Sequence, residues 1–132
     1  MYCFSFIKLL SYATGVILFM ENINSVEYVD LDDALSRIGG NMSLYKRLLE
    51  RFISGNQYEE LVRVLQSGNV EDAVRQAHSL KGVSANLSLV KIRMLSIELE
   101  QLIKDGDDYT ECMDEMKQAF DITMEKIAEI MK

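Results

Sequence analysis

The sequence predicts an all-α protein, an up-and-down antiparallel four-helix bundle with a short leading helix and an extra apolar N-terminal segment. Three observations support this fold class. Proline is absent and glycine is sparse, while the helix formers leucine, methionine, glutamate and lysine are plentiful. Apolar residues recur at steps of three and four, which is the helical period. The turns are short, so consecutive helices should be antiparallel neighbours.

Polar and glycine residues mark the first two helices of the bundle. Asp30 is expected to cap the short leading helix, which should end near Ile38 because the glycine pair 39–40 follows it. Asn41 is expected to cap the second helix. The expected core positions of that helix are Leu44, Leu48 and Phe52. The pair 55–56, Gly-Asn, is either a kink in this helix or a break, after which an apolar stripe continues to Gln66.

Similar signals place the remaining three helices. Asn69 and Asp72 have the spacing of an N-cap and its third residue, so the central helix should begin there and run to about Leu87. Ser88 is expected to cap the next helix. Asp108 and Glu111 have capping-box spacing at the start of the last one. The apolar stripes of these last two helices, Ile92, Leu95, Leu99 and Leu102, then Met113, Met116, Phe120, Met124, Ile127 and Met131, are interpreted as core.

The first twenty residues differ from the rest of the chain. They are apolar or small and polar, with Lys8 as their single charged residue, and the composition changes at Glu21. We therefore divide the chain into an apolar extension over residues 1–25 and a bundle domain over residues 26–132. The favoured interpretation is an extra helix or strand packed on the domain or on a second copy, which would give self-association. There are two alternatives. The segment could associate with a membrane, or it could be an upstream extension before a functional start near Met20.

Charge and cysteine content exclude several functional classes. The net charge of −7 argues against nucleic acid as a partner, because binding to phosphate backbones needs a basic face. The apolar run after Lys8 is short for a membrane span of about 20 residues, so a membrane partner is disfavoured. Two cysteines, Cys3 and Cys112, cannot form a disulfide framework, which favours a cytoplasmic protein. With a single histidine and no glycine-rich phosphate loop, we expect neither a metal nor another cofactor.

The single histidine, His78, lies on the central helix, and a helical wheel places it away from the core. At about 100° per residue, His78 falls about 160° from Leu80. The residues that share the core side with Leu80 are Ala73, Ala77, Ser84 and Leu87. Arg75, Gly82 and Ala85 share the outer face with His78, and Lys81 lies between that face and the flank, one turn after His78.

These positions favour phosphoryl chemistry at His78. A neutral imidazole is a nitrogen nucleophile that is available near pH 7. Lys81 could place a positive charge beside phosphoryl oxygens. Gly82 weakens the helix by about 1 kcal/mol relative to alanine, which suggests that another molecule must approach closely here. On geometry alone, an incidental surface histidine remains the alternative.

The run from His78 to Leu87, HSLKGVSANL, resembles the motif of the histidine-containing phosphotransfer (HPt) domain family. Flanking features over residues 28–131 are also similar to the family. The resemblance implies a four-helix bundle in which His78 accepts and donates a phosphoryl group, Lys81 stabilises it and Gly82 gives a partner steric access. The family usually has glycine where this chain has Ser88.

The resemblance also implies the partners. These would be receiver domains of response regulators or hybrid sensor kinases, which carry the aspartate and the Mg²⁺, so the chain itself would be a phosphoryl carrier without kinase or ATPase activity. The docking surface expected around His78 comprises Val74, Arg75, Ser79, Ala85 and Asn86. A helical interaction module that keeps the bundle without the relay chemistry is the second hypothesis.

Overall fold

The computed structural model describes residues 27–132, and this part of the chain is entirely helical and turn. Its elements are α3 (Leu31–Arg37), α4 (Met42–Ser54), α5 (Gln57–Gln66), α6 (Val70–Asn86), α7 (Val90–Asp105) and α8 (Thr110–Met131). The expectations about the apolar N-terminal segment and about a boundary after residue 25 lie outside the described residues.

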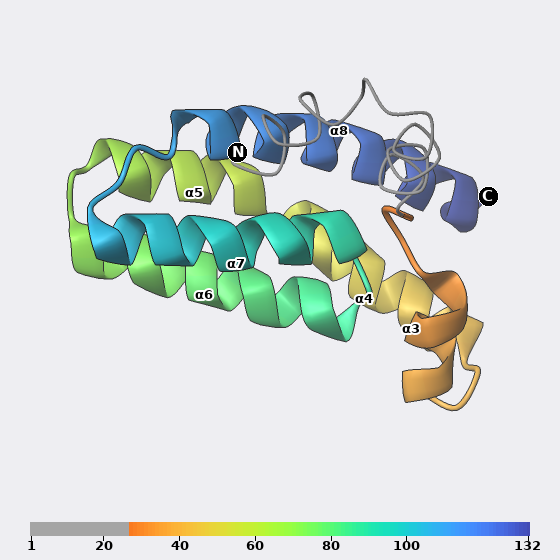
Figure 1. Cartoon of the computed structure of the whole chain (residues 1–132). Coiled ribbons are helices and arrows are strands. Elements are labelled where there is room, and N and C mark those ends of the chain that lie inside the picture. The colour runs from red at the N-terminus through yellow and green to blue at the C-terminus, as the bar shows by residue number, and fades with distance from the viewer. Residues whose placement is uncertain (1–26) are drawn as a thin grey trace, which may run out of the picture.

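The long helices form a bundle in which, from α5 to α8, each neighbour in sequence is a neighbour in space. Helix α5 packs on α6, α6 on α7 and α7 on α8, and α8 returns to contact α4. Figure 1 shows α6 and α7 lying side by side along one side of the bundle, with α3 at the end where α6 turns into α7. The predicted helical bundle with a short leading helix is confirmed. No helix in the described part of the chain is long and apolar enough to cross a membrane.

Three predicted caps are confirmed. The side-chain oxygens of Asp30, Asn41 and Asn69 each accept a hydrogen bond from the backbone N–H three residues later, at 3.0, 3.0 and 3.1 Å. Between α4 and α5 the chain breaks rather than kinks, because Asn56 takes the left-handed conformation with φ of 48°. Asparagine tolerates this conformation better than most residues do.

The predicted capping residues of the last two helices are wrong. Ser88 does not cap α7: Leu89 occupies the cap position, and the Ser88 hydroxyl donates instead to Asp33 Oδ2 at 2.6 Å. Asp108 forms no capping box with Glu111, since its Oδ1 accepts from the backbone N–H and the hydroxyl of Thr110 at 3.0 and 2.7 Å. In both places the side chain that the spacing rule assigns to a cap bonds to another residue. Ser88 bonds to Asp33, which is distant in sequence, and Asp108 bonds to Thr110, which is nearer than Glu111.

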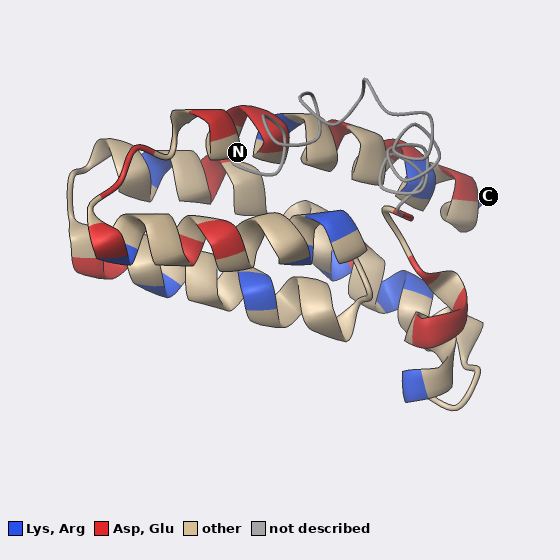
Figure 2. Cartoon of the chain, viewed as in Figure 1, with Lys and Arg blue, Asp and Glu red and all other residues tan. Residues whose placement is uncertain are grey.

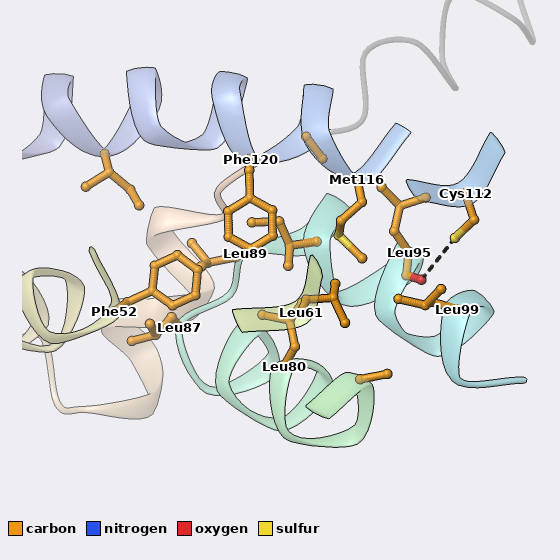
Figure 3. Packing of buried hydrophobic residues seen from close by; sticks show 14 of the residues in the cluster. Phe52, Leu61, Leu80, Leu87, Leu89, Leu95, Leu99, Cys112, Met116 and Phe120 are labelled. Carbon is orange, nitrogen blue, oxygen red and sulfur yellow. Dashed lines mark hydrogen bonds between the residues drawn. The ribbon is translucent and has the colours of Figure 1, made fainter. Parts of the chain in front are cut away.

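The core runs the length of the bundle and draws on every long helix. Figure 3 shows Leu61, Leu80, Leu99 and Met116 meeting there from four different helices, with the stacked rings of Phe52 and Phe120 beside them. On α4 the buried residues are Tyr45, Leu49 and Phe52, whereas the expected Leu44 and Leu48 are not fully buried.

The buried face of α4 differs by one residue from the predicted one, with Tyr45 and Leu49 in place of Leu44 and Leu48, and this difference has a physical reason. The Tyr45 hydroxyl donates to the Leu87 carbonyl at 2.8 Å, so this side chain turns inward and satisfies a buried acceptor at the end of α6. Burial of the phenol, with the negative charge of Asp30 nearby, raises the pKa of Tyr45 to about 12. The hydroxyl therefore stays protonated and keeps donating at any physiological pH.

Candidate functional site

The site begins with the two faces of α6. Ala73, Ala77, Leu80 and Ser84 are buried, so small residues bring this helix close to its neighbours. His78 lies on the other side, with 68% of its side chain exposed. Its placement outside the core, predicted from the helical wheel, is confirmed.

Glu100 of α7 is the residue that sequence reasoning missed. Only 7% of its side chain is exposed, and its Oε1 lies 3.0 Å from His78 Nδ1 and 3.1 Å from Lys81 Nζ. Its Oε2 lies 3.4 Å from Lys104 Nζ. One buried carboxylate therefore joins the exposed histidine to two lysines.

The ionisation of Glu100 follows from this arrangement. Burial by itself would raise the pKa of the Glu100 carboxyl, but hydrogen bonds from His78 and Lys81 and the charges of Lys81 and Lys104 outweigh it. The pKa of Glu100 therefore lies below its usual value, and the group is a carboxylate at neutral pH.

The contact with Glu100 assigns the imidazole tautomer. An ionised carboxylate only accepts hydrogen bonds, so His78 Nδ1 must carry the hydrogen that is donated to it. In a neutral imidazole the Nε2 atom then keeps its lone pair. In its neutral form, His78 thus combines a ring held at Nδ1 with a free lone pair at Nε2, on an exposed side chain.

Lys81 and Gly82 lie one turn beyond His78 on the same helix. Lys81 is one-third exposed, and its ammonium shares Glu100 Oε1 with the histidine. Gly82 is exposed, and a Cβ added to it would meet nothing within 4 Å. The packing of the bundle therefore does not require glycine at this position.

A shallow hollow of about 550 Å³ adjoins His78. Its lining is Val70, Glu71, Val74, Arg75, His78 and Lys104. Of the five residues expected to form a docking surface, Val74 and Arg75 line this hollow with His78, whereas Ser79, Ala85 and Asn86 lie outside it on the remainder of α6. Figure 2 shows basic and acidic bands interspersed along α6 and α7, so this side is not uniformly acidic.

The other titratable residues offer no competing site in the described part of the chain. No group of three His, Cys, Asp or Glu residues among residues 27–132 is placed to hold a metal ion. Cys112 is buried and donates to the Leu95 carbonyl at 3.6 Å (Figure 3). Burial, together with the charges of Glu98 and Glu115, raises the pKa of its thiol to about 12, so it is not a nucleophile at neutral pH.

Comparison with protein families identifies the family of this chain. The family model described as Hpt domain matches residues 47–129, which include His78, Lys81, Gly82 and Glu100. The chain belongs to the Hpt domain family. No curated protein and no solved structure matches it. The match confirms the predicted family. Hpt domains are phosphocarrier modules of phosphorelays and interact with receiver domains.

One departure from the usual Hpt domain pattern is explained by the backbone. Ser88, where the family usually has glycine, takes the left-handed conformation with φ of 55°, which suits glycine better. The helix nevertheless ends as expected, with Asn86 as its last residue. The hydrogen bond from the Ser88 hydroxyl to Asp33 helps to hold serine in this conformation.

Proposed function

We propose that this chain is a histidine phosphotransfer protein whose phosphoryl-accepting residue is His78. The proposal is carried by one observation: the exposed His78 ring is held at Nδ1 by a buried carboxylate, which leaves Nε2 as the nucleophile. The phosphoryl donor and the final acceptor would both be aspartates of receiver domains, in hybrid sensor kinases and response regulators.

The transfer step follows from this tautomer. The Nε2 lone pair attacks the phosphorus of an aspartyl phosphate, the bond from phosphorus to the carboxyl oxygen breaks, and the aspartate leaves as a carboxylate. The Nδ1 hydrogen stays in place, so the ring becomes a phosphorylated imidazolium whose positive charge is stabilised by Glu100. Return of the phosphoryl group to a second aspartate reverses these steps and restores the neutral ring.

Two neighbours of His78 support the same chemistry. Lys81 provides a positive charge one turn away, within reach of oxygens attached to the imidazole, and phosphoryl transfer depends mainly on alignment and such charge stabilisation. The open space at Gly82 lets a receiver domain approach the ring. The Mg²⁺ and the catalytic aspartate would belong to the receiver, and the chain would have no kinase or ATPase activity of its own.

A phosphorylated receiver domain tests the proposal. Wild-type protein incubated with it should acquire a phosphate that is labile to acid and stable to base, and His78→Gln should acquire none. Absence of label on the wild type, or label on His78→Gln, would overturn the assignment. Receiver binding that is unaffected by His78→Ala, without any phosphate uptake, would instead identify an interaction module.

A further inference from the structure

The bundle carries an apolar groove on the side opposite His78. The groove has a volume of about 630 Å³ and lies between α8 and the junction of α4 with α5. Its apolar lining comprises Ile53, Tyr58, Phe120, Met124, Ile127 and Met131. Because α6 and α7 form one side of the bundle and α8 with α4 and α5 forms the other, a molecule in this groove leaves the His78 face open.

The apolar lining of the groove is partly exposed: Ile53 is open to solvent, Tyr58, Met124 and Met131 are half-buried, and Phe120 and Ile127 are buried. Ile53 is 41% exposed, and it is one of only four large apolar residues that are so exposed among residues 27–132. The rings of Tyr58 and Phe120, with centroids 5.5 Å apart, belong to the same lining. An open apolar surface rimmed by charged residues, here Glu59 and Asp121 among others, is typical of a binding site.

The sequence itself supplies a segment with matching chemistry. Residues 1–20 contain aromatic and aliphatic side chains throughout and a single charge, that of Lys8. The apolar side chains match the lining of the groove. Lys117 also lines the groove, and its ammonium lies 3.7 Å from Asp121 Oδ2, so the positive charge of Lys8 is matched to the carboxylate of Glu59 at the rim.

The described chain begins at the same end of the bundle as the Met131 end of the groove. The Asp30 backbone N–H donates to the Ser88 carbonyl at 2.9 Å, which fixes the start of the described chain at the α6–α7 turn. Helix α7 runs away from that turn and α8 runs back, so Met131 lies at the same end of the bundle (Figure 1). The six residues 21–26 can span at most about 20 Å. Residues 1–20 are therefore joined, through a connection of six residues, to the end of the bundle at which Met131 lies.

We propose that residues 1–20 bind in this groove of their own chain. The bound segment covers the exposed side chain of Ile53 and the half-buried side chains of Tyr58, Met124 and Met131, on the face away from His78. This inference does not rest on phosphotransfer, and each can fail without the other.

Limited digestion with trypsin tests the placement, because Lys8 is the only lysine or arginine before Arg37. The full-length chain should be cleaved slowly after Lys8, at a rate that does not change when the protein is diluted. Ala128→Glu puts a charge into the groove at an exposed helical position, so it should accelerate cleavage after Lys8 by at least about tenfold, which corresponds to ~1.4 kcal/mol of lost binding.

Gln118→Glu is the matched control. It makes the same change in charge at an exposed residue of the same helix, outside the groove lining, and it should leave the cleavage rate unchanged. Circular dichroism establishes that both variants keep the helical fold. Mass spectrometry of the products separates cleavage after Lys8 from cleavage elsewhere.

Four results would overturn the proposal. Rapid cleavage after Lys8 in the wild type would show that the segment is not bound. Equal protection in Ala128→Glu would place it elsewhere. Protection that fades on dilution would assign the groove to the segment of a second copy, and protection that appears only with phosphatidylglycerol vesicles would assign the segment to a lipid surface.

Discussion

At the scale of single residues, the pairing of His78 with Glu100 accounts for most of the site. A buried carboxylate that contacts an imidazole and two ammonium groups has a lowered pKa, so its ionised form stabilises the fold. That contribution is complete above the ordinary pKa of 4.5 and is lost as the pH falls through the lower pKa of the folded protein.

We therefore expect Glu100→Gln to change both the pH dependence of stability and the state of the ring. The free energy of unfolding of the wild type, measured in urea, should fall from pH 6 towards pH 3 more steeply than that of the variant. The ¹⁵N shifts of His78 should show a smaller fraction of the tautomer protonated at Nδ1, and phosphate uptake should slow by about tenfold or more. Identical ring shifts in the two proteins would contradict the role assigned to Glu100.

Substitutions of Gly82 allow the effect of this residue on the stability of the bundle to be separated from its effect on the approach of a partner. A Cβ at this position meets no atom within 4 Å, so Gly82→Ala should raise the free energy of unfolding by up to about 1 kcal/mol. Gly82→Gln should also fold well, yet its bulk next to His78 should block the transfer of phosphate from a receiver. Thermal melting and the transfer assay measure the two effects, and unchanged transfer in Gly82→Gln would remove the steric argument.

At the scale of elements, the turn between α6 and α7 depends on a strained serine. Ser88 is 5% exposed, and its left-handed backbone costs a non-glycine residue about 1–2 kcal/mol. Ser88→Ala and Ser88→Gly both lose the hydrogen bond to Asp33, but only glycine relieves the strain. In urea denaturation, Ser88→Gly should therefore be the more stable variant by about 1 kcal/mol, and equal stability would show that the turn relaxes.

The elements also show what the sequence could predict and what it could not. A cap such as Asn69 bonds to a backbone N–H three residues ahead, and the buried face of α6 follows the helical period. Both features depend on local spacing, so the sequence alone predicted them. Ser88 and Asp108 have other partners, and the spacing rule misplaced them. The contact from His78 to Glu100 depends on the position of α7 along the axis of α6. The packing between the two helices sets that position, and the spacing of residues within either helix does not reveal it. Glu100 also adjoins the core residue Leu99, so the helical period does not mark it as functional.

At the scale of the whole molecule, burial makes Cys112 a reporter of global unfolding. Cys112 is 2% exposed and the pKa of its thiol is raised to about 12, so an alkylating reagent at pH 8 should label it only when α8 leaves the bundle. Peptide mapping by mass spectrometry distinguishes it from Cys3. The labelling rate should rise with urea in parallel with the loss of helical circular dichroism, whereas labelling at the rate of a free thiol in native buffer would contradict this packing.

The hydrogen bonds around the α6–α7 turn also tie residues that precede the family match into the bundle. The family match begins at Arg47, but the Leu87 carbonyl is satisfied by Tyr45 and the Ser88 carbonyl by Asp30. Both donors precede the matched region. A chain that started at Arg47 would leave these two acceptors without their donors, at the very end of the helix that carries His78. The region of family similarity is therefore smaller than the packed bundle, which extends at least to Asp30.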